Sequence, residues 1–130
     1  MHHCIGGKSL SVCHCEEDPY AGSFSDALAR ETGKGGTHEK IKARYLALFR
    51  RLASGAQLRS PDAWNAEGEL PNGKRYFAVK VRSIRAYGWF SEKHKGKFII
   101  SHYAFKRGQK LSTHDHKLVC TNWRAVEENP

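Results

Sequence analysis

Three short apolar segments in the last third of the chain constrain its fold more than any other feature. They span Phe77 to Val81, Ile84 to Phe90 and Phe98 to Phe105. Apolar residues recur at every second position in each segment, which is the period of a half-buried β-strand. The connections between the segments are short, so an antiparallel meander is the simplest arrangement. The sequence therefore predicts one sheet with an apolar face.

Helices are predicted in the sequence both before and after these strands. Phe24 to Glu31 can form two helical turns, and Ile41 to Leu52 places its apolar residues on one helical stripe. After the strands, Ser112 to Asp115 resembles a capping box at the start of a closing helix, whose apolar face extends to Val126. The predicted helices therefore lie before and after the meander.

The remaining segments predict a short strand and a loop. Ser9 to Cys15 can form a strand, and Gln57 to Lys74 is rich in turn-forming residues. At 130 residues, 39% of them hydrophobic, the chain suits one domain with a modest core. We expect a small α+β fold over residues 1–130, in which a mostly antiparallel sheet packs against two N-terminal helices and a C-terminal helix.

Positive charge is concentrated in the strand-rich part. Between Lys74 and Arg124, thirteen Lys and Arg residues stand against only Glu92 and Asp115, a net charge of +11 compared with +9 for the whole chain. Like charges on a small surface repel each other unless a polyanion neutralises them, so nucleic acid is the first expected partner. On the helix around Ile41 to Leu52, most basic residues lie off the apolar stripe and predict a solvated face: Lys40, Lys42, Arg44, Arg50 and Arg51.

The cysteines and the apolar runs indicate in which cellular compartment the protein is expected. Cys4, Cys13 and Cys15 lie near the N-terminus, while Cys120 stands alone in the predicted last helix. This distribution favours free, reduced thiols over a disulfide scaffold. Cys13, His14 and Cys15 are too closely spaced for the usual zinc knuckle, so we expect no metal and no cofactor. The apolar runs are too short to span a bilayer and no secretory signal is evident, so we expect a cytoplasmic protein without a membrane partner.

The segment from His102 to Ser112 resembles a known family. A core strand ends there in a histidine and an aromatic residue, followed by two basic residues and a Gln-Lys turn into the last helix. This pattern is similar to the RelE/ParE superfamily of bacterial toxins, and closest to its HigB-like, phage Gp49-like branch. Phe77 to Lys80 resembles the family's Leu-Trp-Glu-Leu-Arg strand, with Lys in the Arg position, and Ile84 to Tyr87 resembles its Tyr-Arg-hydrophobic-hydrophobic strand. The resemblance covers residues 37–126 and is poor over 1–36.

This resemblance implies a toxin of a type II toxin–antitoxin system, which cuts messenger RNA on the ribosome without metal and is held in check by a cognate antitoxin. Such cleavage uses the neighbouring 2′-hydroxyl as nucleophile, and it needs a proton acceptor, a proton donor and cations. The candidate catalytic residues are Arg85, Tyr87, His102, Lys106 and Lys110. The candidate nucleic-acid-binding residues are Lys80, Arg82, Tyr103, Arg107, His114 and His116.

Several alternatives remain open. His102 shares strand parity with Phe98 and Ile100, so a buried core histidine is an alternative to a catalytic one. His114 and His116 can also be ordinary surface residues. Two other functions fit the same resemblance, namely a ParE-like poison of DNA gyrase and a catalytically silent phage or host nucleic-acid-binding protein of the same fold. The histidines and tyrosines near the basic run favour proton transfer and hence the ribonuclease.

Overall fold

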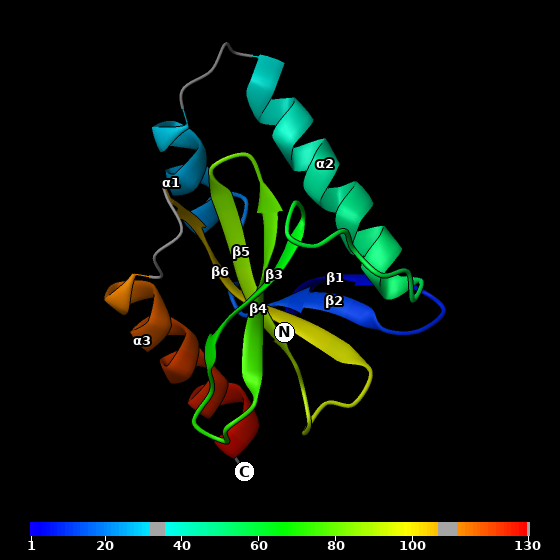
Figure 1. Ribbon diagram of the computed structural model, residues 1–130, viewed down its shortest axis with the longest axis vertical. Helices are drawn as coiled ribbons and strands as arrows, with labels where there is room; N and C mark the ends of the chain where they lie inside the picture. The colour runs from blue at the N-terminus through cyan, green and yellow to red at the C-terminus, as the bar shows by residue number, and fades with distance from the viewer. Residues whose placement is uncertain (32–35, 107–111, 130) are drawn as a thin grey trace.

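The computed structural model describes residues 1–31, 36–106 and 112–129. These residues form an α+β fold, with a six-stranded sheet and helices on both of its faces (Figure 1). The strands are β1 (His2–Gly6), β2 (Ser11–His14), β3 (Trp64–Glu69), β4 (Arg75–Val81), β5 (Ile84–Phe90) and β6 (Lys97–Phe105). The helices are α1 (Ser23–Arg30), α2 (Gly36–Ala53) and α3 (Thr113–Trp123), and a π-helical turn, Arg124–Glu128, continues α3.

The predicted meander forms the centre of the sheet. The strand order is β1-β2-β6-β5-β4-β3, and β4, β5 and β6 are consecutive antiparallel neighbours. The short N-terminal strand β2 joins the same sheet parallel to β6. The prediction of an α+β fold with a mostly antiparallel sheet is therefore confirmed. One difference is that β1 and β2 precede α1 and α2, so that strands and not helices begin the fold.

Two edge strands were not predicted. The segment from Gln57 to Lys74 contains β3, so its prediction as a loop is wrong over Trp64 to Glu69. Pairing with β4 stabilises this strand, and the Trp64 ring stacks on Phe77 at a centroid distance of 4.8 Å. The other edge strand, β1, pairs antiparallel with β2. Both edge strands are stabilised by cross-strand partners, which the pattern within either strand does not reveal.

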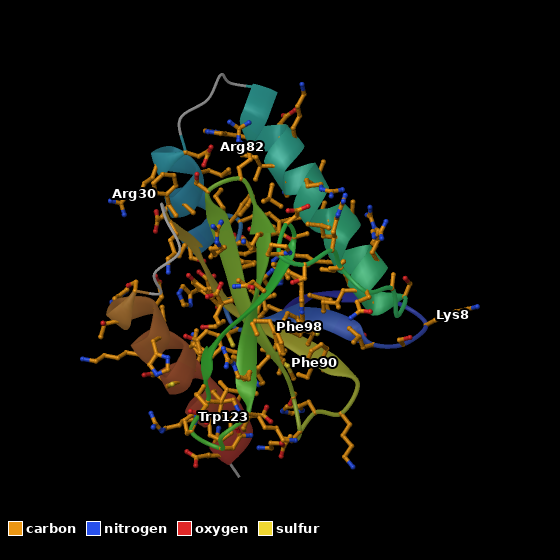
Figure 2. All side chains as sticks on the ribbon, viewed as in Figure 1. Lys8, Arg30, Arg82, Phe90, Phe98 and Trp123 are labelled. Atoms are coloured by element: carbon orange, nitrogen blue, oxygen red, sulfur yellow. A yellow bond between two sulfur atoms is a disulfide. The ribbon has the colours of Figure 1, made fainter. Side chains whose placement is uncertain are left out.

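Helix α2 covers one face of the sheet, as its apolar stripe predicts. Ile41, Tyr45 and Phe49 are buried in the core cluster on this face. The Tyr45 hydroxyl lies 3.0 Å from the carbonyl oxygens of both Val79 and Ile84, which ties α2 to the β4–β5 hairpin. Phe90 and Phe98 pack against each other on the part of the sheet farther from α2 (Figure 2).

Helix α3 covers the opposite face. Val119 and Trp123 pack there with Trp89 and Ile99 in a second core cluster. The predicted cap is confirmed, because the Ser112 hydroxyl accepts a hydrogen bond from the Asp115 backbone N–H at 3.3 Å. Within the described residues, no helix is both long and apolar enough to cross a membrane.

The cysteine prediction is wrong for one pair. Cys4 on β1 and Cys13 on β2 form a disulfide, because strand pairing brings their Cα atoms to 4.1 Å. These two residues are therefore not free zinc ligands. Cys15 and Cys120 are free thiols, and burial raises the pKa of Cys15 to about 12. Among the described residues, the structure groups no three metal-ligating side chains together.

Candidate active site

A groove opens along β6 where its neighbour ends. Strand β2 pairs with β6 only from Lys97 to Ile100, so along the second half of β6 the described residues form no strand on that side. Helices α1 and α3 flank this half from the two faces of the sheet (Figure 1). The space between them is a groove of about 790 Å³. Its floor comes from β6, and its walls carry Asp26 and Arg30 of α1 and His114 and Asp115 of α3.

A bulge in β6 turns His102 toward the α3 face. The register with β5 shifts between Tyr87, which faces His102, and Gly88, which faces Ile100, so Ser101 is an extra residue. His102 consequently lies on the Tyr87 side of the sheet, and its parity with Ile100 is lost. The glycine opposite the bulge allows close packing, because a Cβ on Gly88 would lie 2.6 Å from the Phe98 ring. The shared parity expected from the sequence is therefore wrong.

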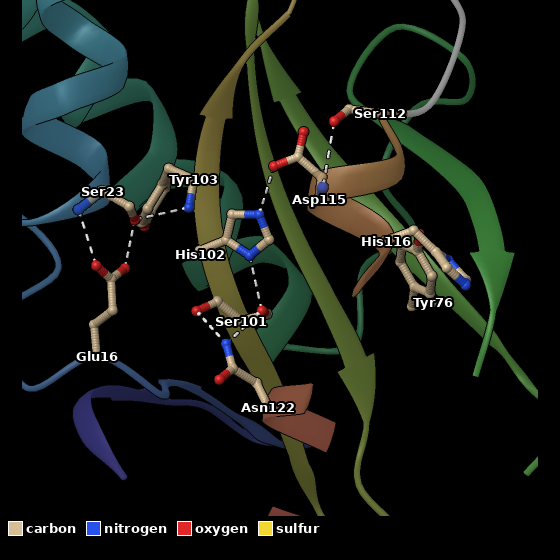
Figure 3. Close-up of polar contacts among 10 residues, drawn as sticks. All are labelled: Glu16, Ser23, Tyr76, Ser101, His102, Tyr103, Ser112, Asp115, His116 and Asn122. Carbon is tan, nitrogen blue, oxygen red and sulfur yellow. Dashed lines mark hydrogen bonds and ion pairs between the residues drawn. The ribbon is translucent and has the colours of Figure 1, made fainter. Parts of the chain in front are cut away.

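A directed chain of hydrogen bonds fixes the His102 ring (Figure 3). The Asn122 amide donates to the Ser101 hydroxyl at 2.8 Å, which leaves the Ser101 O–H to donate to His102 Nδ1, also at 2.8 Å. In the neutral ring the proton therefore resides on Nε2, which donates to Asp115 Oδ1 at 2.9 Å. The chain sets both the tautomer and the orientation of the imidazole.

Asp115 is held as a carboxylate beside this ring. Its burial favours the neutral acid, but the interactions with His102, Ser112 and His114 together outweigh burial, and the pKa of Asp115 is lowered. The Asp115 side chain is 13% exposed and lines the groove, whereas His102 is 6% exposed beneath it. One carboxylate oxygen meets His102 and the other points away from the ring (Figure 3). Asp115 is therefore the member of the pair that can meet a ligand.

Two polar groups near this pair have no partner among the described residues. They are the Lys106 ammonium and the Tyr87 hydroxyl, and both atoms are shielded from solvent. Burial lowers the pKa of Lys106, an effect that Glu67 and Asp115 oppose and Arg85 reinforces. Burial also raises the pKa of Tyr87, which keeps its hydroxyl protonated. A shielded ammonium that makes no hydrogen bond or ion pair among the described residues would be satisfied by a bound anion.

The wall opposite Asp115 is fixed by a separate set of contacts. The Glu16 carboxylate accepts hydrogen bonds from both the backbone N–H and the hydroxyl of Ser23, at the start of α1. The Ser23 hydroxyl in turn accepts the Tyr103 backbone N–H of β6 at 2.9 Å. This satisfies an edge group that no neighbouring strand could pair. The first turn of α1 is thereby docked onto the open edge of β6.

The structure brings together only part of the predicted set. Four of them line the groove, namely His102, Tyr103, Lys106 and His114, and Arg85 and Tyr87 lie on the adjacent strand β5. Arg85 is held by its own hairpin, donating to the Arg82 carbonyl at 3.0 Å. Other predicted residues lie away from the Asp115 side of the groove or outside the described residues.

Tyr103 belongs to the core and not to an exposed base-binding surface. It is 3% exposed, and its hydroxyl lies 2.7 Å from His14 Nε2 on the α2 face. On α3, His116 Nδ1 lies 3.0 Å from the Tyr76 hydroxyl, and its Nε2 lies 3.7 Å from the Cys120 sulfur. His116 thus packs between α3 and β4, while His114 is exposed at the groove.

Lys80 and Arg82 line a different pocket, beside α2. Arg107 and Lys110 lie outside the described residues, so their predicted roles stay predictions. Sequence reasoning did not select Ser101, Asp115 or Asn122 as site residues. The sequence marks Asp115 as a member of the capping box. No sequence pattern marks Ser101 or Asn122, because their roles depend on the bulge.

No protein-family model matches this sequence, and no curated protein or solved structure matches it significantly. The family resemblance therefore stays a prediction, and the site geometry is the remaining guide to function.

Proposed function

We propose that this chain is the toxin of a type II toxin–antitoxin system, a RelE/HigB-like endoribonuclease that cuts ribosome-bound messenger RNA without a metal ion. The observation that supports this most is the groove in which Asp115, oriented by His102, lies near a shielded Lys106 ammonium that makes no hydrogen bond or ion pair among the described residues. A phosphodiester is an anion of the right chemistry for such a site. The α+β fold, with a mostly antiparallel sheet and helices on both faces, also supports the proposal.

The first step in this proposal is attack by the ribose 2′-hydroxyl on the adjacent phosphorus. The Asp115 oxygen that points away from His102 accepts the 2′-proton, and the imidazole keeps the carboxylate in place. His102 is a positioning residue here, because both of its ring nitrogens are already hydrogen-bonded. The Lys106 ammonium then stabilises the extra negative charge on the crowded phosphate.

The second step is departure of the 5′-oxygen. The bond between phosphorus and this oxygen breaks, and the oxygen takes a proton from His114, whose side chain is exposed at the groove. The products are a 2′,3′-cyclic phosphate and a 5′-hydroxyl, so no water, metal or redox partner enters this reaction. The cognate antitoxin would inhibit it by covering the groove and the basic surface around it.

The experiment is cleavage of messenger RNA on programmed ribosomes by the purified chain. We expect cut messenger RNA with the wild type, and a loss of roughly 10- to 1000-fold at saturating substrate for Lys106→Ala. Lys117→Ala is the matched control, because Lys117 is exposed on α3 and does not line the groove. Full activity of folded Lys106→Ala would contradict the proposed site. Intact messenger RNA together with gyrase-linked DNA breaks in cells would contradict the ribonuclease function and support the ParE-like one.

A further inference from the structure

A second concavity lies at the turn of the β4–β5 hairpin, beside the N-terminal half of α2. Figure 2 shows Arg82 at this end of the sheet, close to that helix. The pocket has a volume of about 510 Å³, within the range of small-ligand sites. Its lining is Lys40, Ile41, Arg44, Asp62, Ala63, Lys80, Val81 and Arg82. It shares no lining residue with the groove at His102.

Two of its cations are held in place by neighbouring groups. Lys80 Nζ donates to the Pro61 carbonyl oxygen at 2.9 Å. Arg82 Nε lies 3.1 Å from Glu31 Oε1, and the Glu31 side chain is only 5% exposed. These contacts restrain the long side chains before any ligand binds, which lowers the entropy cost of binding.

The other two cations are Lys40 and Arg44, which project from α2 one helical turn apart. Both are exposed, and among the described residues neither is in an ion pair. The sequence pattern predicts a solvated face for them, but the fold places them in one pocket with Lys80 and Arg82. The acidic residue of the pocket, Asp62, already pairs with Arg59 at 3.4 Å.

The floor of the pocket is apolar. Ile41, Ala63 and Val81 are buried there, at 2%, 6% and 8% exposure. Glu31 already pairs with Arg82, but the other three cations have no ion pair among the described residues, and an anion at the centre would relieve their mutual repulsion. A nucleotide matches this combination, because its phosphate is anionic and its base and sugar offer apolar surface. A bare inorganic ion would leave the floor unused.

The position of the pocket connects it to the cleavage groove. The turn between β4 and β5 separates the two, and the Ser83 carbonyl in this turn accepts the Lys106 backbone N–H at 2.7 Å. An RNA strand leaving Lys106 can therefore pass over the turn to reach Arg82. We infer that the pocket lined by Lys40, Arg44, Lys80 and Arg82 binds a phosphate-bearing nucleotide of the RNA chain, outside the cleavage groove. This inference rests on the proposed function, since RNA is the ligand in both.

The test measures binding of a fluorescent single-stranded RNA of about twelve nucleotides to the full chain across a salt series. Each phosphate contact on a single strand contributes about 0.7 to the slope of log K against log salt. The Lys40→Ala/Arg44→Ala variant should therefore lower the slope by about 1.4, with affinity falling roughly 10- to 100-fold at low salt. Arg50→Ala/Arg51→Ala is the matched control, because it removes the same net charge from exposed positions farther along α2 and outside the pocket.

An unchanged slope in the pocket variant, or an equal loss in the control, would overturn the inference. So would displacement of the RNA by micromolar adenosine monophosphate at constant ionic strength, because the pocket would then be a site for a free nucleotide. Cleavage on ribosomes is measured separately. If the wild type binds RNA through the pocket but never cuts messenger RNA, the inference stands and the proposed function fails.

Discussion

The two faces of the sheet each bury a histidine, and the surroundings of these histidines differ. His14 lies on the α2 face at 1% exposure, and His102 lies on the α3 face at 5% exposure. His14 Nε2 meets the Tyr103 hydroxyl at 2.7 Å, and its Nδ1 lies 3.3 Å from the His3 carbonyl. His102 instead meets the Asp115 carboxylate. The two imidazole rings are buried to nearly the same extent, so the hydrogen-bonding neighbour determines the chemical role of each ring.

Without a carboxylate, burial dominates at His14. It lowers the pKa of His14 to about 4, with the His3 carbonyl opposing that effect, so the ring stays neutral near pH 7. His102 belongs to a chain that ends on an acid in the groove. The comparison indicates that a histidine in this sheet contributes to packing on one face and to positioning a carboxylate on the other.

The largest difference is expected from replacing each histidine by glutamine. His102→Gln should slow cleavage of ribosome-bound messenger RNA by roughly 100- to 1000-fold, because Asp115 loses the group that orients it. His14→Gln should lower stability and leave the cleavage rate of the folded fraction unchanged. Single-turnover cleavage, corrected for the folded fraction by circular dichroism, compares them. Equal cleavage rates for the two variants would show that His14 and His102 do not differ in their roles as proposed.

The second difference is in acid stability. The folded-state pKa of His14 lies below its unfolded value of 6.5, so the unfolded chain binds more protons between pH 6.5 and about 4. This contribution to stability is complete above pH 6.5 and is lost as pH falls toward 4, at a cost of about 3 kcal/mol. His14→Gln should flatten the free energy of unfolding in this window, as measured by urea titration. Asp115 has a lowered pKa, so its contribution should be lost only below its ordinary value of 3.8. A His14→Gln curve parallel to that of the wild type would contradict this.

A smaller effect is expected from reducing the Cys4–Cys13 disulfide, which ties β1 to the His14 side of the fold. The bonded cysteines are 9 residues apart in sequence, and closing a loop of that size contributes about 2.6 kcal/mol in the chain-entropy model. Urea unfolding with and without a reducing agent should show a loss of up to this size. Cleavage should be unaffected, because neither cysteine lines the groove. Loss of cleavage on reduction, with the fold intact, would mean that the two regions are coupled.

The smallest effect concerns Lys106 at alkaline pH. Burial lowers its pKa, so its charge is lost at a lower pH than that of an ordinary lysine. RNA affinity of the wild type should therefore decline on the alkaline side, by roughly tenfold if one phosphate contact is lost. Lys106→Arg should bind with little pH dependence over the same range, because arginine stays protonated. Identical alkaline profiles for the two proteins would show that Lys106 does not carry this contact.

Local pattern predicted the central elements of the fold. The alternation in β4, β5 and β6 and the apolar stripe of α2 each reflect one buried face, and Ser112 reflects a local cap. The edge strands β1 and β3 were missed, because their residues gain stability from cross-strand partners such as Phe77.

The candidate site was harder to predict than the fold. The orientation of His102 depends on a one-residue register shift against Tyr87 and Gly88, which two-residue periodicity cannot reveal. Its partner Asp115 looked like a capping residue, and Asn122 looked like an ordinary polar position on a helix. Lys40 and Arg44 are exposed, as expected, but a helical pattern does not reveal that Lys80 and Arg82 line the same pocket. The interactions that were missed therefore join elements distant in sequence.

A double-mutant cycle between His102 and Asp115 tests whether the two residues act as one unit. We would compare single-turnover cleavage of ribosome-bound messenger RNA by His102→Gln, Asp115→Asn and the double variant. If His102 acts through Asp115, each single variant should lose roughly 100-fold or more, and the double variant should be no more than about threefold slower than the worse single one. Full activity in either folded single variant, or losses that multiply in the double variant, would show that the two residues do not form the proposed pair.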